Sequence, residues 1–179
     1  MERSVIIAGF GGQGVILAGK ILAQAGMDHG LEVTWLPSYG PEMRGGTANC
    51  TVVLSDEPVG SPIVDEPSDL IAMNRPSLDK FEPTVASGGA VVINTSLIER
   101  KTAREDLNAQ YLRLNDVANE AGSMRAVNMV ALGAYLKATG VVPLEVVKST
   151  MAEMLEASGK GKFVPLNEKA LEAGFNAAG

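Results

Sequence analysis

The most constraining feature of this chain is a short apolar run that ends in a glycine-rich turn near the N-terminus. Residues 4–8 read Ser-Val-Ile-Ile-Ala, a pattern typical of a strand buried on both faces of a parallel sheet. Residues 9–14 follow directly, and Gly9, Gly11 and Gly14 have the G-x-G-x-x-G spacing. Such glycines permit a tight turn and a close approach of the backbone to a ligand. The chain is therefore predicted to begin with a strand, a turn and a helix.

The helix is predicted over residues 13–29, because four apolar residues fall on one helical face. These are Ala18, Ile21, Leu22 and Ala25. Gly30 is a suitable C-cap, and a second strand is predicted at residues 32–36. Strand, helix and strand together have the length of a right-handed βαβ unit.

Further strands are predicted downstream, with one short helix among them. The strands cover residues 47–55, 69–73, 89–94 and, in a weaker pattern, 110–114, and the helix covers 76–81. Strands that alternate with helices indicate an α/β fold. We expect a Rossmann-like, mostly parallel sheet flanked by helices.

The C-terminal third is predicted to be helical. Residues 126–139 are apolar nearly all round, which indicates a helix in the core or in an interface. Another helix begins near Pro143. Its inner stripe consists of Val147, Met151 and Leu155. Asn167 is a suitable N-cap for a final short helix that ends near Gly174, and residues 1–179 are expected to form a single domain.

Composition limits the classes of function. The formal net charge of −6 argues against general nucleic-acid binding, because that function needs a basic face. One cysteine, Cys50, and one histidine, His29, provide no disulfide framework, zinc site or iron–sulfur cluster within the chain. We find no secretory signal and no apolar stretch of about 18 residues, so the expected location is cytoplasmic, without membrane contact.

Several reactive residue types receive a structural interpretation. Cys50 is expected to be a small buried hydrophobe in a strand, and His29 to stabilise the end of a helix. Five acids around a proline-rich loop are interpreted as solvated surface rather than as a metal site. They are Asp56, Glu57, Asp65, Glu66 and Asp69.

The glycine-rich turn is open to three interpretations. Autonomous dinucleotide binding requires an acid at the end of the second strand to hold the ribose hydroxyls. Here that strand ends at Leu36, and the nearby acid, Glu32, lies at its beginning. A site for an anion or a partner protein is favoured, because the N-terminus of the following helix offers unpaired N–H groups. The turn could also serve only to pack the helix on the sheet.

A second glycine-containing segment, residues 38–46, follows the second strand. Loops at the carboxyl ends of the strands form the binding crevice of an open α/β sheet, so this segment should lie beside the glycine-rich turn. Arg44 could bind a carboxylate or phosphate, and Gly45 and Gly46 could bring backbone amides to the same ligand. Alternatively, Arg44 pairs with Glu42, or the segment with Tyr39 is a protein–protein contact.

Together, the two segments resemble a known family. Gly-Phe-Gly-Gly-Gln-Gly at 9–14 and Ser-Tyr-Gly-Pro-Glu-Met-Arg-Gly-Gly at 38–46 are similar to signature segments of the gamma subunits of 2-oxoacid:ferredoxin oxidoreductases. Residues 128–133 and 167–174 are also similar to that family, so the resemblance covers essentially the whole chain.

The resemblance implies a subunit that is inactive alone. The complex would convert a 2-oxoacid and coenzyme A to acyl-CoA, carbon dioxide and reduced ferredoxin. Thiamine diphosphate, magnesium and iron–sulfur clusters would be held by alpha, beta and ferredoxin-like delta subunits. The residues expected to face coenzyme A or those subunits are Gly9, Gly11, Gly12, Gln13, Gly14, Tyr39, Arg44, Gly45 and Gly46.

Two other functions remain open at this point. One is a free-standing Rossmann-type nucleotide-binding oxidoreductase, and the other is an architectural module without a ligand. Pyruvate, 2-oxoglutarate and branched-chain 2-oxoacids are all compatible substrates. The absence of a fused ferredoxin-like extension favours the latter two.

Overall fold

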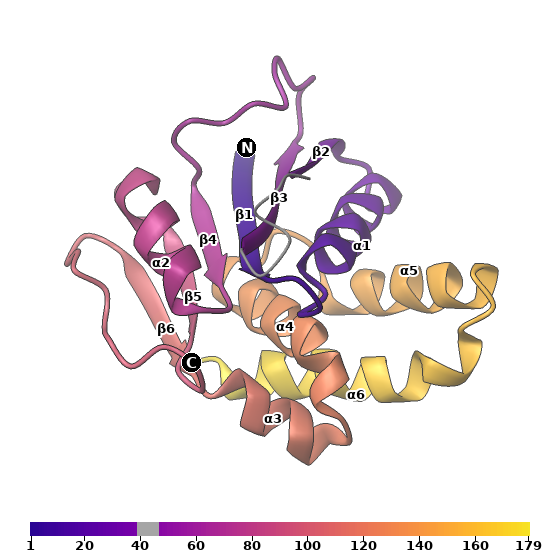
Figure 1. The fold of residues 1–179 in the computed structure, drawn as a ribbon. Helices are drawn as coiled ribbons and strands as arrows, with labels where there is room; N and C mark the ends of the chain where they lie inside the picture. The colour runs from indigo at the N-terminus through magenta and orange to yellow at the C-terminus, as the bar shows by residue number, and fades with distance from the viewer. Residues whose placement is uncertain (39–46) are drawn as a thin grey trace.

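The computed structural model describes residues 1–38 and 47–179 (Figure 1). Within them, a central sheet has the strand order β2-β3-β1-β4-β5-β6. The strands are β1 (Glu2–Phe10), β2 (Glu32–Ser38), β3 (Thr47–Ser55), β4 (Asp69–Ala72), β5 (Ala90–Asn94) and β6 (Asn108–Leu112). Only β3 runs against the others, since it pairs antiparallel with both β1 and β2. The predicted mostly parallel α/β sheet is confirmed.

The position of β3 corrects the prediction of a simple βαβ unit. β1 and β2 run in the same direction, but β3 lies between them and pairs with both. An apolar strand pattern does not distinguish a parallel from an antiparallel neighbour, because both bury the same alternating residues. The β1–α1–β2 unit that carries the glycine-rich turn therefore has the antiparallel strand β3 inserted between its two parallel strands.

Helices connect and cover the strands. They are α1 (Val15–Asp28), α2 (Arg75–Phe81), α3 (Leu114–Ala121), α4 (Val127–Thr139), α5 (Leu144–Ala157) and α6 (Val164–Ala177). Short 3-10 turns are η2 (Glu82–Thr84), η3 (Met124–Ala126) and η4 (Gly161–Phe163). None of the helices in the described part of the chain is long and apolar enough to cross a membrane.

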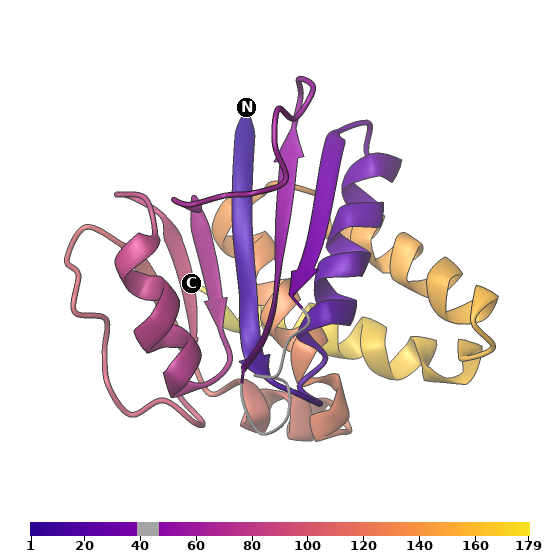
Figure 2. The same cartoon turned by 45° about the horizontal axis from the view of Figure 1, so that its top comes forward.

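The sheet has an apolar core on each face. On one face, Val5 and Ile7 of β1 pack with residues of α1, α4, α5 and α6. On the other face, Ile6 and Ala8 pack with Leu78 of α2. Figure 2 shows α2 on the opposite side of the sheet from α4 and α6. This two-sided burial explains why residues 5–8 of the first strand are apolar at every position rather than at alternate ones.

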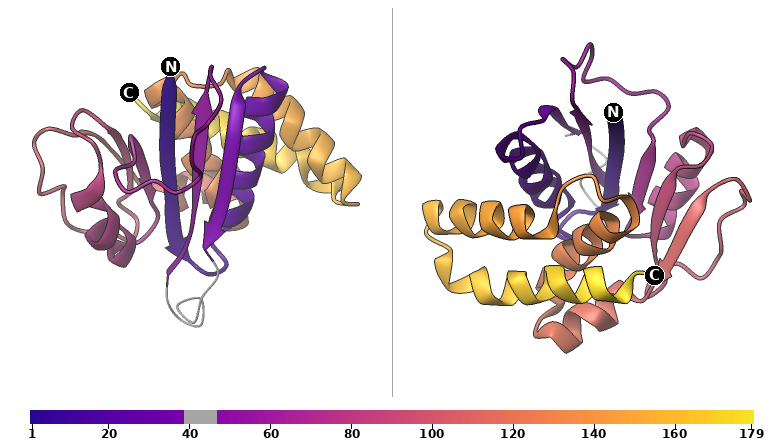
Figure 3. Two further views of the ribbon diagram at one scale, coloured as in Figure 1. Left: turned by 90° about the horizontal axis from the view of Figure 1, so that it is seen from above. Right: turned by 180° about the vertical axis from the view of Figure 1, so that it is seen from behind.

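Helix α4 lies in the core, as its pattern predicted, and packs closely on α6 (Figure 3). A side chain at Gly174 would overlap the carbonyl of Val130, and one at Gly133 would overlap the carbonyl of Leu171. Both glycines therefore permit a close helix crossing.

The predicted ends of the final helix are wrong. α6 spans Val164–Ala177, so Asn167 and Gly174 lie inside it. Asn167 donates from Nδ2 to the Phe163 carbonyl at 2.9 Å instead of capping the helix. Asn167 and Gly174 wrongly suggested a helix start and a helix end. Gly174 is instead required because α6 packs closely on α4 there.

Candidate functional site

The glycine-rich turn joins the carboxyl end of β1 to the start of α1. Gly12 has φ +91° and Gly14 has φ +73°, both in the left-handed region that other residues rarely adopt. Gly14 is the N-cap of α1, and its carbonyl accepts the first helical hydrogen bond, from Ala18 N at 3.0 Å. The glycines therefore reverse the chain and start the helix at one edge of the sheet.

Gln13 holds the turn from within. Its N–H donates to the Phe10 carbonyl at 3.1 Å, and its Oε1 accepts from Phe10 N at 2.6 Å. Its Nε2 lies 3.5 Å from the Met73 carbonyl, at the end of β4. A Cβ at Gly9 would lie 2.5 Å from Gln13 Oε1, so that glycine makes room for the carboxamide. The Gln13 side chain is thus engaged by the protein.

Among the described residues, no side chain compensates the partial charge at the N-terminus of α1. The helix has no side-chain cap and no acidic residue in its first turn. The partial positive charge of the first-turn amides is therefore available to an anion.

A cleft of about 470 Å³ lies against this helix end. Its lining comes from the turn (Phe10, Gly11, Gly12, Gly14), from α1 (Val15, Ile16, Leu17, Lys20) and from β2 and β3 (Trp35, Ala48). Phe10 and Leu17 are each 41% exposed, although both are large and apolar. The cleft thus combines apolar walls, helix-terminal amides and the ammonium of Lys20. The sequence did not predict these walls, because they come from the turn, from α1 and from two strands.

The second predicted segment lies largely outside the described residues. This holds for Tyr39, Arg44, Gly45 and Gly46. Its flanks are described, and Thr47 pairs with Phe10 while Ser38 pairs with Asn49. Both flanks therefore lie at the same end of the strands as the glycine-rich turn, and the position predicted for the segment between them stays a prediction.

Cys50 lies beneath the cleft and is fully buried, as expected. Its Sγ donates to the Val15 carbonyl at 3.4 Å. A side chain at Gly19 would overlap this sulfur, so α1 packs tightly on β3 here. Burial raises the pKa of the Cys50 thiol to about 12, which keeps it neutral.

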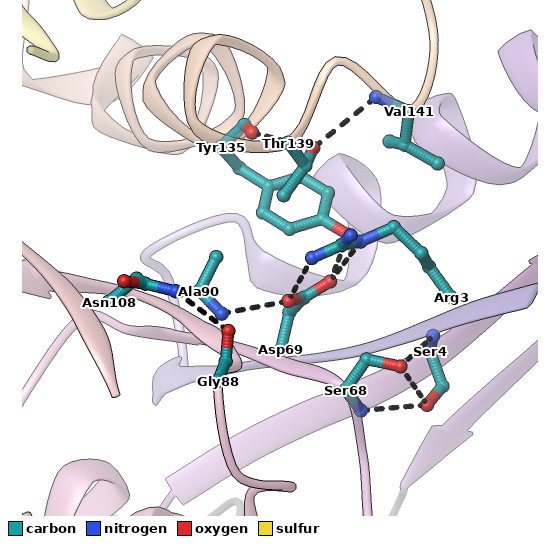
Figure 4. A network of polar contacts seen from close by, with 10 residues as sticks. All are labelled: Arg3, Ser4, Ser68, Asp69, Gly88, Ala90, Asn108, Tyr135, Thr139 and Val141. Atoms are coloured by element: carbon teal, nitrogen blue, oxygen red, sulfur yellow. Dashed lines mark hydrogen bonds and ion pairs between the residues drawn. The ribbon is translucent and has the colours of Figure 1, made fainter. Parts of the chain in front are cut away.

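A buried polar network that the sequence did not reveal lies at the amino ends of the parallel strands (Figure 4). Asp69 accepts from Arg3 at 2.9 and 2.7 Å, from Tyr135 Oη at 2.9 Å and from Ala90 N at 2.9 Å. Burial, with the nearby Asp69 carboxylate, raises the pKa of Tyr135 well above its usual value. The prediction that Asp69 is solvated is wrong, because its partner Arg3 is 66 residues away in sequence. This network anchors α4 to the sheet.

The fold and the turn define a Rossmann-like unit whose open edge lies at the carboxyl ends of its parallel strands. The model of the pyruvate ferredoxin/flavodoxin oxidoreductase family matches residues 4–177. The chain belongs to this family. The predicted resemblance to its gamma subunits is confirmed by the relatives described next.

Two curated relatives are from Methanothermobacter marburgensis. The ketoisovalerate oxidoreductase subunit VorA is 44% identical over 173 residues, which are 97% of this chain and 36% of that protein. This chain thus spans about a third of the length of VorA. The 2-oxoglutarate synthase subunit KorC is 38% identical over 149 residues, covering 79% of this chain and 80% of that protein.

Two solved structures share the fold. The gamma subunit of a keto/oxoacid ferredoxin oxidoreductase from Geobacter sulfurreducens has a TM-score of 0.84 and 31% identity, covering 98% of both chains. The 2-oxoglutarate:ferredoxin oxidoreductase of Magnetococcus marinus, bound to 2-oxoglutarate, coenzyme A and succinyl-CoA, has a TM-score of 0.88 and 26% identity. That match covers 99% of this chain and 31% of the Magnetococcus chain.

Proposed function

We propose that this chain is the gamma subunit of a multisubunit 2-oxoacid:ferredoxin oxidoreductase and that its glycine-rich turn contacts coenzyme A. The complex would oxidise and decarboxylate a 2-oxoacid with coenzyme A and pass two electrons to ferredoxin. The observation that carries the proposal is the cleft at the N-terminus of α1, in a member of this family. A relative of the same fold binds coenzyme A.

The chemistry of the cleft suits parts of coenzyme A. The diphosphate is anionic and would be attracted by the uncapped N-terminus of α1. Lys20, which is exposed, would attract a phosphate group. The exposed ring of Phe10 and the exposed side chain of Leu17 would cover an apolar part of the ligand, such as the adenine. Each feature is modest alone, and together they match an anion joined to a flat ring.

The remaining predicted residues complete the proposed site. Gly9, Gly11, Gly12 and Gly14 would allow close approach of the ligand, and Gln13 would hold the turn in shape. Arg44, with Gly45 and Gly46, would add a charged fork and further amides, and Tyr39 would contact the ligand or a partner subunit.

The reaction itself would take place on partner subunits. Alpha, beta and delta subunits would supply thiamine diphosphate, magnesium and the iron–sulfur clusters, and would select the 2-oxoacid. The names of the relatives favour 2-ketoisovalerate or 2-oxoglutarate as substrate. We also place the enzyme in the cytoplasm.

A matched pair of glycine variants tests the proposal. Gly12 (φ +91°) lines the cleft, and Gly30 (φ +89°) follows the other end of α1; among residues 1–38 and 47–179, a Cβ at either meets nothing within 4 Å. Alanine therefore causes similar backbone strain at both positions. In the assembled complex, Gly12→Ala should raise KM for coenzyme A about tenfold, whereas Gly30→Ala should not. Equal KM values in both variants would indicate that the turn is architectural.

The alternative of a free-standing nucleotide-binding oxidoreductase is not favoured. β3 occupies the place beside β1 that the acid-bearing second strand takes in dinucleotide-binding proteins. Glu32 starts β2, and this strand runs parallel to β1, so Glu32 lies at the edge opposite the turn. Calorimetry of the isolated chain with NAD, NADP and FAD should show no micromolar binding.

A further inference from the structure

The carbonyl of Gly14 is held by a side chain from a distant part of the sequence. Asn128, the second residue of α4, donates from Nδ2 to the Gly14 carbonyl at 3.1 Å, across 114 residues. The same carbonyl accepts from Ala18 N. The bond therefore joins the start of α4 to the start of α1, directly behind the glycine-rich turn.

Both ends of the Asn128 carboxamide are used, which fixes its orientation. Oδ1 accepts from Met129 N at 3.0 Å and so satisfies an amide of the first turn of α4. Only the amide end of the side chain can donate to the Gly14 carbonyl. Asn128 is 5% exposed, so water does not readily replace this contact.

The fit between the two residues is close. A side chain at Gly14 would overlap Asn128 Nδ2, and the φ of +73° at Gly14 also favours glycine. Asn128 is not among the residues that line the cleft, whereas Gly14 is. Asn128 can therefore influence a ligand in the cleft only through Gly14 and the helix that begins there.

We infer that Asn128 is a positioning residue for coenzyme A. Its hydrogen bond to Gly14 sets the direction of the first-turn amides of α1 and thereby the affinity of the cleft for the coenzyme. This inference rests on the proposed function of the turn. Asn128 would act through Gly14, since Gly14 lines the cleft and Asn128 does not.

The other end of α4 provides a matched control. Tyr135 lies in the same helix, is fully buried, and donates one hydrogen bond, to Asp69 at the opposite edge of the sheet. Tyr135→Phe removes that bond and loosens α4 without touching the turn. An effect specific to Asn128 cannot then be explained by general loosening of the helix.

Two substitutions at Asn128 isolate the bond to Gly14. Asn128→Asp keeps the acceptor for Met129 N but loses the donor, whereas Asn128→Leu loses both without adding a charge, so the donor to Gly14 is the loss that the two variants share. In the assembled complex, both should raise KM for coenzyme A about tenfold, with kcat and KM for the 2-oxoacid within about twofold of wild type. Tyr135→Phe should leave all three constants unchanged.

Amide hydrogen exchange of the isolated chain gives a second readout. Both Asn128 variants should exchange the amide of Ala18 about tenfold faster than wild type, and Tyr135→Phe should not. Unchanged KM and exchange in the Asn128 variants, or an equal rise of KM in Tyr135→Phe, would overturn the inference. If Gly12→Ala raises KM and the Asn128 variants do not, only the positioning role fails. If none of them raises KM, the proposed function fails as well.

Discussion

The polar groups at the two ends of the parallel strands have opposite roles. One set lies at the amino ends of the strands (the amino edge below) and the other at their carboxyl ends (the carboxyl edge below). At the amino edge, Arg3, Tyr135 and the amide of Ala90 all donate to the buried carboxylate of Asp69 (Figure 4). At the carboxyl edge, the N-terminus of α1 has no side-chain cap and borders a cleft. A network whose members satisfy one another stabilises the fold, whereas uncapped amides beside a cleft can bind a ligand. We therefore propose that the functional site lies at the carboxyl ends of the strands.

The largest expected effect concerns the thiol beneath the cleft and tests how deep the opening extends. Because the pKa of Cys50 is raised from 9.0 to about 12, the native thiolate should be about a thousandfold rarer at pH 8 than in the unfolded chain. Labelling by a thiol reagent, compared with and without denaturant, measures this. The raised pKa also means that the contribution of the thiol to stability is complete below pH 9 and is lost as pH rises toward 12. Native labelling within tenfold of the denatured rate would show that the cleft reaches Cys50.

The next largest effect is expected for the buried Asp69 network at the amino ends of the strands. Asp69→Ala leaves the Tyr135 hydroxyl and the Ala90 amide without their acceptor and should lower the free energy of unfolding by about 3–5 kcal/mol. Asp56→Ala is the control, since Asp56 makes an exposed ion pair with the N-terminal amine. It should leave the urea midpoint nearly unchanged. Equal midpoints for the two variants would contradict the structural role of the Asp69 network.

A smaller effect is expected at the turn itself. Gly14→Ala combines an unfavourable φ with an overlap on Asn128 Nδ2, and should destabilise the chain by about 2 kcal/mol. Gly12→Ala has the unfavourable φ alone and should cost about 1 kcal/mol. Urea unfolding of both variants measures the difference. A smaller loss for Gly14→Ala than for Gly12→Ala would show that the turn adapts around Asn128.

The smallest effect is expected for the charge of Lys20, which lines the cleft at the carboxyl ends of the strands. Lys20 is exposed, so Lys20→Ala should raise KM for coenzyme A in the complex by about twofold to threefold at low salt. The difference from wild type should vanish near 1 M salt, because screening removes the attraction. A salt-independent difference would indicate a direct packing contact instead.

Much of the fold could be predicted from local patterns. The continuous apolar run at residues 4–8 became part of β1, buried by helices on both faces, and the all-round apolar pattern became the buried helix α4. The insertion of β3 between β1 and β2 could not be predicted, because strand direction depends on long-range pairing. Gly174 looked like a helix end and is instead a contact point for α4.

In the candidate site, too, the features set by local sequence could be predicted, and those that depend on distant elements could not. The spacing of the glycines identified the turn, because it reflects local backbone geometry. Asn128 and the apolar walls of the cleft were not identified, because they approach the turn from distant elements. Asp69 was misassigned for the same reason, since an acid near a loop gives no local sign of an arginine 66 residues away.

The most direct test of the account is amide hydrogen exchange of the assembled complex with and without coenzyme A. We predict that coenzyme A protects residues 10–17 of this chain and causes no change near Arg3, Asp69 and Ala90. Protection confined to other subunits, with residues 10–17 unchanged, would contradict it.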